Sequence, residues 1–256
     1  MKIAIALRTC GNVFNWWDVP DRMVDVSKQT LLLTCLNSLA RAISNSKHEI
    51  IFSVHDDNSS PDFISCMDKV IKQYNIDYQL INTEKKQNCI TQYQWLKQQQ
   101  CDYVYHVEDD YLHTDDSIDQ MVDFCEQMKI EHPFDKNFYA VFPVNHPHRY
   151  QPEGLYPSMI VKTNNRYWRT INHSSLTFFM DKVAHNRYDD YVRSQAYGWS
   201  ERIPEDDTIN LLWYSGNVRL LCPMESVAWH IADRTHEDTI GNWKQVWNDN
   251  LVEYNE

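Results

Sequence analysis

The first half of the chain alternates between short apolar runs and longer amphipathic stretches. The apolar runs are rich in Val, Ile and Tyr, which favour buried strands, and the predicted strands cover 3–7, 49–54, 78–81 and 103–107. Apolar residues at helical spacing predict helices over 27–44, from 61 onward and over 88–100. Strands that alternate with helices through short links indicate a mainly parallel sheet.

The pattern changes after Asp110. A helix is predicted over 117–129, and the apolar spacing of 240–254 is also helical. Further strands are predicted at 139–144, 175–179 and 218–221. The proline-containing stretch 146–166 is expected to be an irregular loop, and loops of this length are usually functional or mobile. Without a repeat or a clear linker, we expect one domain.

Three carboxylates, Glu108, Asp109 and Asp110, directly follow the apolar run 103–107. Like charges this close repel one another, which is costly unless a cation lies between them. In open α/β sheets, ligands bind outside the carboxyl ends of the strands. The run therefore predicts a divalent metal site beside a bound ligand. The alternative is a solvated acidic turn that caps the helix beginning at Ser117.

Two more acidic clusters stand at strand ends or turns, and the set of three resembles the GT-A nucleotide-sugar glycosyltransferases of the family-2 type. The stretch 56–62 (DDNSSPD) is similar to the D-D-G-S-x-x-D turn of that family. Residues 107–110 (VEDD) look like its D-x-D element, and 204–207 (PEDD) resembles its later E-D element, which holds the catalytic base. Asn58 stands where glycine is usual, a tolerable change because asparagine accepts left-handed conformations.

The resemblance implies an α/β fold: a single GT-A (Rossmann-like) domain over 1–256, with a mainly parallel central sheet flanked by helices. Residues 1–113 would bind the nucleotide sugar and 114–256 the acceptor. The implied activity is transfer of a sugar from a nucleoside diphosphate sugar, with UDP-sugar expected, to an acceptor hydroxyl with inversion. Mn²⁺ or Mg²⁺ would neutralise the diphosphate leaving group, since hard cations prefer carboxylate oxygens.

By the same resemblance, Asp110 would ligate the metal, and Glu108 or Asp109 would contact the ribose or a metal-bound water. Several GT-A enzymes place a late histidine on the metal, which makes His230 the candidate second ligand, with His236 as the other choice. A packing role is the alternative reading of His230, because it follows a tryptophan.

Asp57 would hydrogen-bond the nucleotide base, and its alternative is an Asx turn or a helix cap. At the end of the first strand, Arg8 and Thr9 occupy the place where the family's backbone meets the nucleotide. Arg8 is a candidate contact for the diphosphate, with an ordinary surface arginine as the alternative.

Asp206 is the candidate general base, which would take the proton from the acceptor hydroxyl as that oxygen attacks the anomeric carbon. Asp207 is the substitute if the motif is shifted by one residue. The alternative is a helix N-cap, because the acids precede the apolar run 209–213 and acids are common in a first helical turn. The polar stretch 172–175 is expected near the acceptor.

The formal net charge of -12 and pI of about 5.3 disfavour nucleic acid as a partner. A hydroxymethylated DNA base, as in phage-type enzymes, nevertheless stays open beside a glycan or lipid-linked glycan as acceptor. The basic residues that would contact its phosphates are Lys162, Arg166, Arg169, Lys182, Arg187 and Arg193. Aromatic residues that would stack on sugars, at least half of them expected in the core, are Trp168, Tyr197, Trp199, Trp213 and Trp229.

Two other classes compete. A sugar-nucleotide nucleotidyltransferase should show a glycine-rich N-terminal loop with a basic residue, which 9–12 (TCGN) does not provide. A non-catalytic carbohydrate-binding domain has no need of all three acid clusters. The 7 cysteines are scattered singly, and no apolar run approaches membrane-spanning length, so we expect a cytoplasmic protein without a transmembrane segment.

Overall fold

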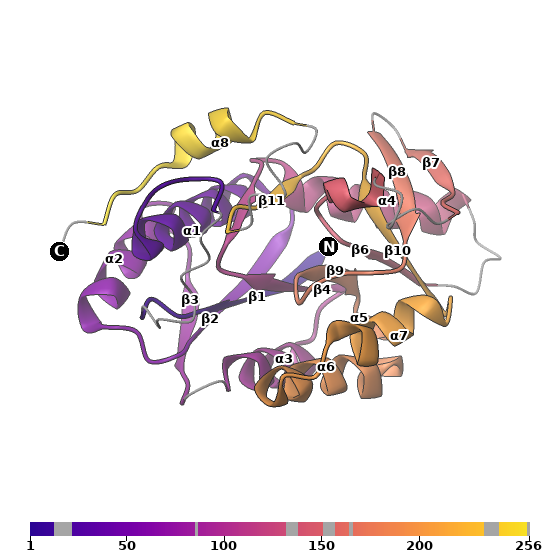
Figure 1. The fold of residues 1–256 in the computed structure, drawn as a ribbon, viewed down its shortest axis with the longest axis horizontal. Coiled ribbons are helices and arrows are strands. Elements are labelled where there is room, and N and C mark those ends of the chain that lie inside the picture. The colour runs from indigo at the N-terminus through magenta and orange to yellow at the C-terminus, as the bar shows by residue number, and fades with distance from the viewer. Residues whose placement is uncertain are drawn as a thin grey trace.

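The computed structural model describes residues 1–12, 22–84, 87–131, 138–150, 157–163, 166–232 and 241–254. At its centre lies a nine-stranded sheet with helices on both faces (Figure 1). In spatial order its strands are β3 (Tyr78–Asn82), β2 (Glu49–Asp56), β1 (Lys2–Thr9), β4 (Tyr103–Glu108), β9 (Phe178–Asp181), β6 (Phe138–Val141), β10 (Val218–Pro223), β8 (Arg166–Ile171) and β7 (Ile160–Thr163). Only β9 and β8 run against the other seven, so the predicted α/β fold with a mainly parallel sheet is confirmed.

The sheet separates two hydrophobic cores, and β1 shows how one strand serves both. Its isoleucines and Leu7 enter one core, while Ala4 and Ala6 enter the other. The first core is covered by α1 (Lys28–Asn45), α2 (Pro61–Lys72), α4 (Ser117–Glu131) and α8 (Trp243–Asn250). The second is covered by α3 (Asn88–Gln98), α5 (Lys182–Arg187), α6 (Asp189–Glu201) and α7 (Ile209–Tyr214).

Local signals place the helices of the first half where the sequence predicts them. The side chain of Ser27 accepts a hydrogen bond from Thr30 N and caps α1. Ser60 caps α2 in the same way, with Pro61 in its first turn. These caps confirm the predicted starts of both helices.

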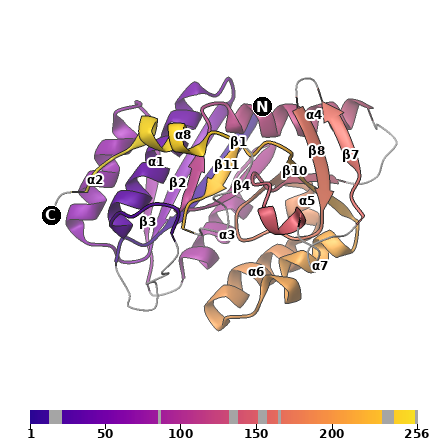
Figure 2. The same ribbon diagram turned by 45° about the horizontal axis from the view of Figure 1, so that its top comes forward.

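The second half departs from the prediction at the edge of the sheet. Part of the expected loop 146–166 is ordered as the 3-10 helix η2 (Pro147–Tyr150) and the strand β7. Strand β7 pairs antiparallel with β8 and extends the sheet (Figure 2). Alternation was hard to detect because β7 is largely exposed and β8 carries Arg166, Arg169 and Thr170. The helices α5 and α6 were not predicted either.

Two segments close the fold around α1. A small antiparallel sheet pairs β5 (Tyr111–His113) with β11 (Ala228–His230). The C-terminal helix ends at Asn250 rather than near Tyr254, and the residues after it run extended along α1. There Val252 N donates to Thr34 Oγ1 at 3.1 Å. Among the described residues, no helix is both long enough and apolar enough to cross a membrane.

Candidate active site

The carboxyl ends of three parallel strands meet at one edge of the sheet. In the register, Thr9 at the end of β1 lies beside Asp56 at the end of β2. On its other side, β1 places Arg8 beside Glu108 at the end of β4. The acid clusters at 56–57 and 108–110 therefore share one edge, as the strand-helix pattern predicted.

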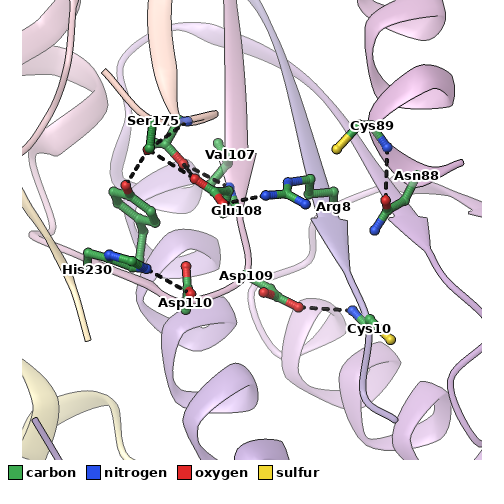
Figure 3. A network of polar contacts seen from close by, with 12 residues as sticks. Arg8, Cys10, Asn88, Cys89, Val107, Glu108, Asp109, Asp110, Ser175 and His230 are labelled. Carbon is green, nitrogen blue, oxygen red and sulfur yellow. Dashed lines mark hydrogen bonds and ion pairs between the residues drawn. The ribbon is translucent and has the colours of Figure 1, made fainter. Parts of the chain in front are cut away.

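Glu108 lies inside a polar network rather than facing solvent (Figure 3). One carboxylate oxygen pairs with the guanidinium of Arg8. The other accepts from the hydroxyls of Ser175 at 3.1 Å and Thr177 at 3.3 Å. The Arg8 guanidinium also lies 4.5 Å from the ring centre of Trp199 in α6. Arg8 and Glu108 thus link β1 and β4 to the start of β9 and to α6.

Asp109 turns toward β1. Its Oδ2 accepts a hydrogen bond from Cys10 N at 3.0 Å, and its carboxylate also bonds with the Thr9 side chain. Burial, and then the negative charge of Asp110, raise the pKa of Asp109 to about 6. Such a carboxyl gains from a nearby cation, because the cation offsets both penalties.

Asp110 pairs with His230. Its Oδ2 lies 3.0 Å from His230 Nε2, and its carbonyl accepts from Ile231 N at 2.9 Å (Figure 3). The imidazole stacks on Tyr111, with 5.0 Å between ring centres and 18° between planes. Burial alone would raise the pKa of Asp110, but the charge and hydrogen bond of His230 outweigh it and hold that pKa below its ordinary value. The two residues expected to ligate a metal are therefore neighbours, and His236 lies outside the described residues.

The donor atoms at this pair fit a divalent cation. Asp110 Oδ1 is buried and has no hydrogen-bond partner among the described residues, a costly state for a carboxylate oxygen. A carboxylate with an imidazole suits Mn²⁺, whereas Mg²⁺ prefers oxygen alone. The described residues contain no group of three or more histidine, cysteine or acidic side chains arranged to hold a metal. Any further ligands of a cation at this pair would have to come from water or from a bound ligand.

The turn after β2 has the shape that its motif predicts. Asp56 is buried and accepts from the backbone N and the hydroxyl of Ser59. Asn58 adopts a left-handed conformation with φ of 58°, which explains why asparagine can replace glycine here. Asp57 is half-buried, and its backbone N donates to Thr9 O at 2.8 Å. Asp56 therefore builds the turn, and Asp57 lies beside the end of β1.

Asp206 lies on the short 3-10 helix η4 (Glu205–Asp207), at the start of α7. Its Oδ1 accepts from Asn210 Nδ2 at 3.0 Å and from Tyr214 OH at 3.2 Å, and it faces His173 Nδ1 at 3.3 Å. The hydrogen bond from Asn210 lowers the pKa of Asp206. Asp207 is exposed, and its side chain makes no hydrogen bond or ion pair with the described residues.

The helix-cap reading of these acids does not fit the geometry. Thr208 is the N-cap residue of α7, and that helix has no side-chain cap hydrogen bond. Asp206 instead bonds side chains one and two turns further along the chain. One of these side chains, Asn210, also bonds Ser174 N and lies 2.6 Å from His173 Nδ1.

The segment 173–175 joins the two acidic regions. At one end, His173 faces Asp206. At the other, Ser175 bonds Glu108 at 3.1 Å and the hydroxyl of Tyr111 at 2.7 Å. Sequence reasoning placed this polar stretch near the acceptor but missed Tyr111 and Asn210. The spacing of 206, 210 and 214, four residues apart, was the available signal, although Asp206 lies on η4 before α7 begins.

The basic and aromatic residues of the second half divide between the interior and the surface of the fold. Lys182 is buried and donates to Leu96 O at 2.6 Å, and Arg169 is buried over the ring of Tyr150. Arg193 pairs with Asp190 on its own helix. Lys162, Arg187 and Arg193 are exposed and Arg166 is partly buried, so the six basic residues are split between the surface and the interior. Trp168, Trp213 and Trp229 are core residues, which confirms that at least half of the aromatic set is internal.

Comparison with solved structures shows a fold of the GT-A type. A crystal structure of S. aureus TarS superposes with a TM-score of 0.52 at 12% identity, over 89% of this chain and 36% of that one. TarS 1-349 in complex with UDP gives 0.53 at 13% identity, over 86% of this chain and 57% of that one. This chain thus spans between about a third and three fifths of the TarS chains. No protein-family model matches the sequence, and neither does any curated protein.

Proposed function

We propose that this protein is a metal-dependent glycosyltransferase that moves a sugar from a UDP-sugar to an acceptor hydroxyl with inversion at the anomeric carbon. The observation that carries the proposal is the Asp110–His230 pair, 3.0 Å apart at the carboxyl edge of the parallel strands of a GT-A fold. A buried carboxylate oxygen without a partner among the described residues, beside an imidazole, is a site that gains from a cation.

Asp110 and His230 would hold Mn²⁺ or Mg²⁺. When bound, the cation would neutralise the charge that grows on the diphosphate leaving group. Asp109 directly precedes Asp110, and burial and the charge of Asp110 raise its pKa to about 6. When ionised, it adds negative charge to the same region. Glu108 would position this loop through Arg8 and Ser175.

Asp57 would contact the nucleotide base from the turn after β2. The support for UDP is that one structural neighbour was solved with UDP. Thr9 bonds both the Asp57 backbone and the Asp109 side chain. The end of β1 would therefore lie beside the same bound nucleotide.

Asp206 would act as the general base. Oδ1 is occupied by hydrogen bonds, while Oδ2 makes none with the described residues and the side chain is 62% exposed. As the acceptor oxygen bonds to the anomeric carbon, Oδ2 would take its proton and the bond to UDP would break on the opposite face. This single displacement inverts the anomeric centre. Because the net charge is -12 and two of the six basic candidates, Arg169 and Lys182, are buried, a glycan or lipid-linked glycan is the favoured acceptor over DNA.

The experiment is a thermal-melting screen of nucleoside diphosphate sugars, each with and without Mn²⁺. We expect a UDP-sugar to raise the melting temperature only when Mn²⁺ is present, because a ligand that binds the folded state stabilises it. The same mixtures should then release UDP slowly, with water as acceptor. Stabilisation by free sugars without nucleotide would instead indicate a carbohydrate-binding domain. Release of pyrophosphate from a nucleoside triphosphate and a sugar phosphate would indicate a nucleotidyltransferase.

A further inference from the structure

Asn210 has an unusually constrained side chain. It is completely buried on α7, and its Oδ1 accepts a hydrogen bond from Ser174 N at 3.0 Å. Because a backbone N–H can only donate, this bond fixes which end of the amide points toward Ser174. The Nδ2 end must then face the other way, toward His173 Nδ1 at 2.6 Å and Asp206 Oδ1 at 3.0 Å.

The orientation of the Asn210 amide determines the tautomer of His173 and the oxygen through which Asp206 is hydrogen-bonded. An amide N–H that donates to Nδ1 of His173 requires that atom to be unprotonated, so the neutral ring carries its proton on Nε2. The second N–H of the amide donates to Oδ1 of Asp206. Tyr214 adds its hydroxyl to the same oxygen at 3.2 Å. Both hydrogen bonds therefore hold the Asp206 carboxylate through Oδ1, and Oδ2 is left toward solvent.

We propose that Asn210 is a positioning residue for Asp206: its buried amide orients the carboxylate so that Oδ2 meets the acceptor hydroxyl, and it keeps His173 in the Nε2–H tautomer beside that oxygen. The inference rests on the proposed function, because it assigns a partner to its general base. The His173 ring is half-exposed. Its Nε2–H can therefore donate a hydrogen bond to the acceptor, or to a water molecule that receives the departing proton.

The surroundings of Asp206 support an effect on its proton affinity. The groups that face it are His173 and Tyr214, while Glu205 and Asp207 share its short helix. Behind His173, the Arg149 guanidinium donates to the His173 carbonyl at 3.0 Å. Hydrogen bonds to a carboxylate favour its ionised form, so losing the amide donor raises the pH at which Asp206 becomes active.

The test replaces the amide by a carboxyl of the same shape. Asn210→Asp keeps an oxygen for Ser174 N but removes both donors and adds charge next to Asp206. The rate of UDP release with Mn²⁺, from the UDP-sugar that stabilises the wild type, is measured across pH for wild type and variant, together with UDP affinity. The matched control is Asn217→Asp, the same change at an exposed position just beyond α7. The tautomer of His173 is read in parallel from its ring ¹⁵N shifts.

We expect the acid limb of the pH–rate profile to lie about one pH unit higher in Asn210→Asp than in wild type. At a pH below both acid limbs, the variant should therefore release UDP roughly tenfold more slowly, with unchanged affinity for UDP. His173 should change toward the Nδ1–H tautomer, and Asn217→Asp should follow wild type. If Asn210→Asp does not fold, Tyr214→Phe removes another donor to the same oxygen and should move the limb in the same direction. Superimposable profiles and tautomers in a folded variant, or an unmoved limb in Tyr214→Phe, would overturn the inference. Absence of UDP release by wild type with every UDP-sugar tried would overturn the proposed function instead.

Discussion

His230 Nε2 lies 3.0 Å from Asp110 Oδ2, although 120 residues separate them along the chain. The small sheet of β5 and β11 brings them together, since its register places His230 beside Tyr111, the residue after Asp110. Stacking on Tyr111 then fixes the plane of the imidazole. The geometry supports the proposed role of His230 as a metal ligand, beside its packing contact with Tyr111.

Asp110→Asn should abolish the Mn²⁺-dependent part of UDP binding. The amide keeps the shape but loses the charge that would hold the cation. Titration calorimetry with UDP, with and without Mn²⁺, measures the difference between the two conditions. Asp123→Asn, which removes an exposed acid that pairs with Lys47, is the matched control and should bind as wild type does. Equal Mn²⁺ dependence in wild type and Asp110→Asn would remove Asp110 from the metal site.

Asp57→Ala should weaken UDP binding without changing the Mn²⁺ requirement. A hydrogen bond to a base edge is typically worth about 1 kcal/mol or somewhat more, so affinity should fall by roughly five- to tenfold. Asp56→Ala is not a suitable control, because Asp56 builds the turn through Ser59. Comparing UDP with inorganic diphosphate locates the effect: diphosphate affinity should not change. A matching loss for diphosphate would contradict contact with the base.

Asp206→Asn should retain UDP and Mn²⁺ binding but lose sugar transfer. The amide cannot take a proton from the acceptor hydroxyl, and removal of a general base typically lowers the rate by about 10²- to 10⁴-fold. The measurement is UDP release beside calorimetric UDP affinity on the same preparation. Asp207→Asn separates the two possible registers of the motif. Wild-type turnover in Asp206→Asn, with loss in Asp207→Asn, would transfer the role of base to Asp207.

The sequence was sufficient for the features that depend on local order. The end of β4 and the turn at Asn58 follow from residues adjacent in the chain, as do the helix starts at Ser27 and Ser60. A strand that ends in acids predicts a ligand site without further information, because ligands bind at the carboxyl ends of the strands in an open α/β sheet.

What the sequence could not predict depends on contacts between distant segments. Arg8 was a candidate contact for the diphosphate, with a surface arginine as the alternative; the structure rules out the surface arginine, because the guanidinium is buried against Glu108, 100 residues away, and over Trp199. The role of Asn210 becomes visible only when Ser174 N fixes the direction of its amide. The β7–β8 hairpin was missed because an edge strand with exposed, polar residues lacks the alternation that a half-buried strand shows.

Arg8→Ala should destabilise the fold by about 3 kcal/mol or more, because it leaves the largely buried Glu108 carboxylate without its counter-charge. Adding Glu108→Gln should recover part of that loss, since the neutral amide needs no counter-charge. Urea unfolding of wild type, both single variants and the double variant gives the coupling energy. Additive effects in that cycle would show that the ion pair contributes nothing beyond its separate parts.

Acid should destabilise the protein through its buried histidines. Burial lowers the pKa of His55 and of His113 to about 4, against 6.5 for an ordinary histidine. Between these values the unfolded chain binds more protons than the folded one, so stability falls as the pH drops below about 6.5 and levels off near 4. From pH 7.5 to 5 each such histidine costs about 2 kcal/mol. Asp109, whose folded pKa of about 6 lies above the usual 3.8, acts in the opposite sense, and so does Asp56, whose pKa is also raised by burial.

His55→Gln isolates one of these contributions. Glutamine retains hydrogen-bonding groups for Ser53 and Thr91 but does not titrate, so stability should depend less steeply on pH. Urea unfolding at pH 7.5 and at pH 5 gives the difference for wild type, for His55→Gln and for His148→Gln, an exposed control. The drop in unfolding free energy should be smaller by about 2 kcal/mol in His55→Gln and unchanged in the control. An equal drop in all three proteins would mean that His55 is protonated to the same extent in the folded and unfolded states.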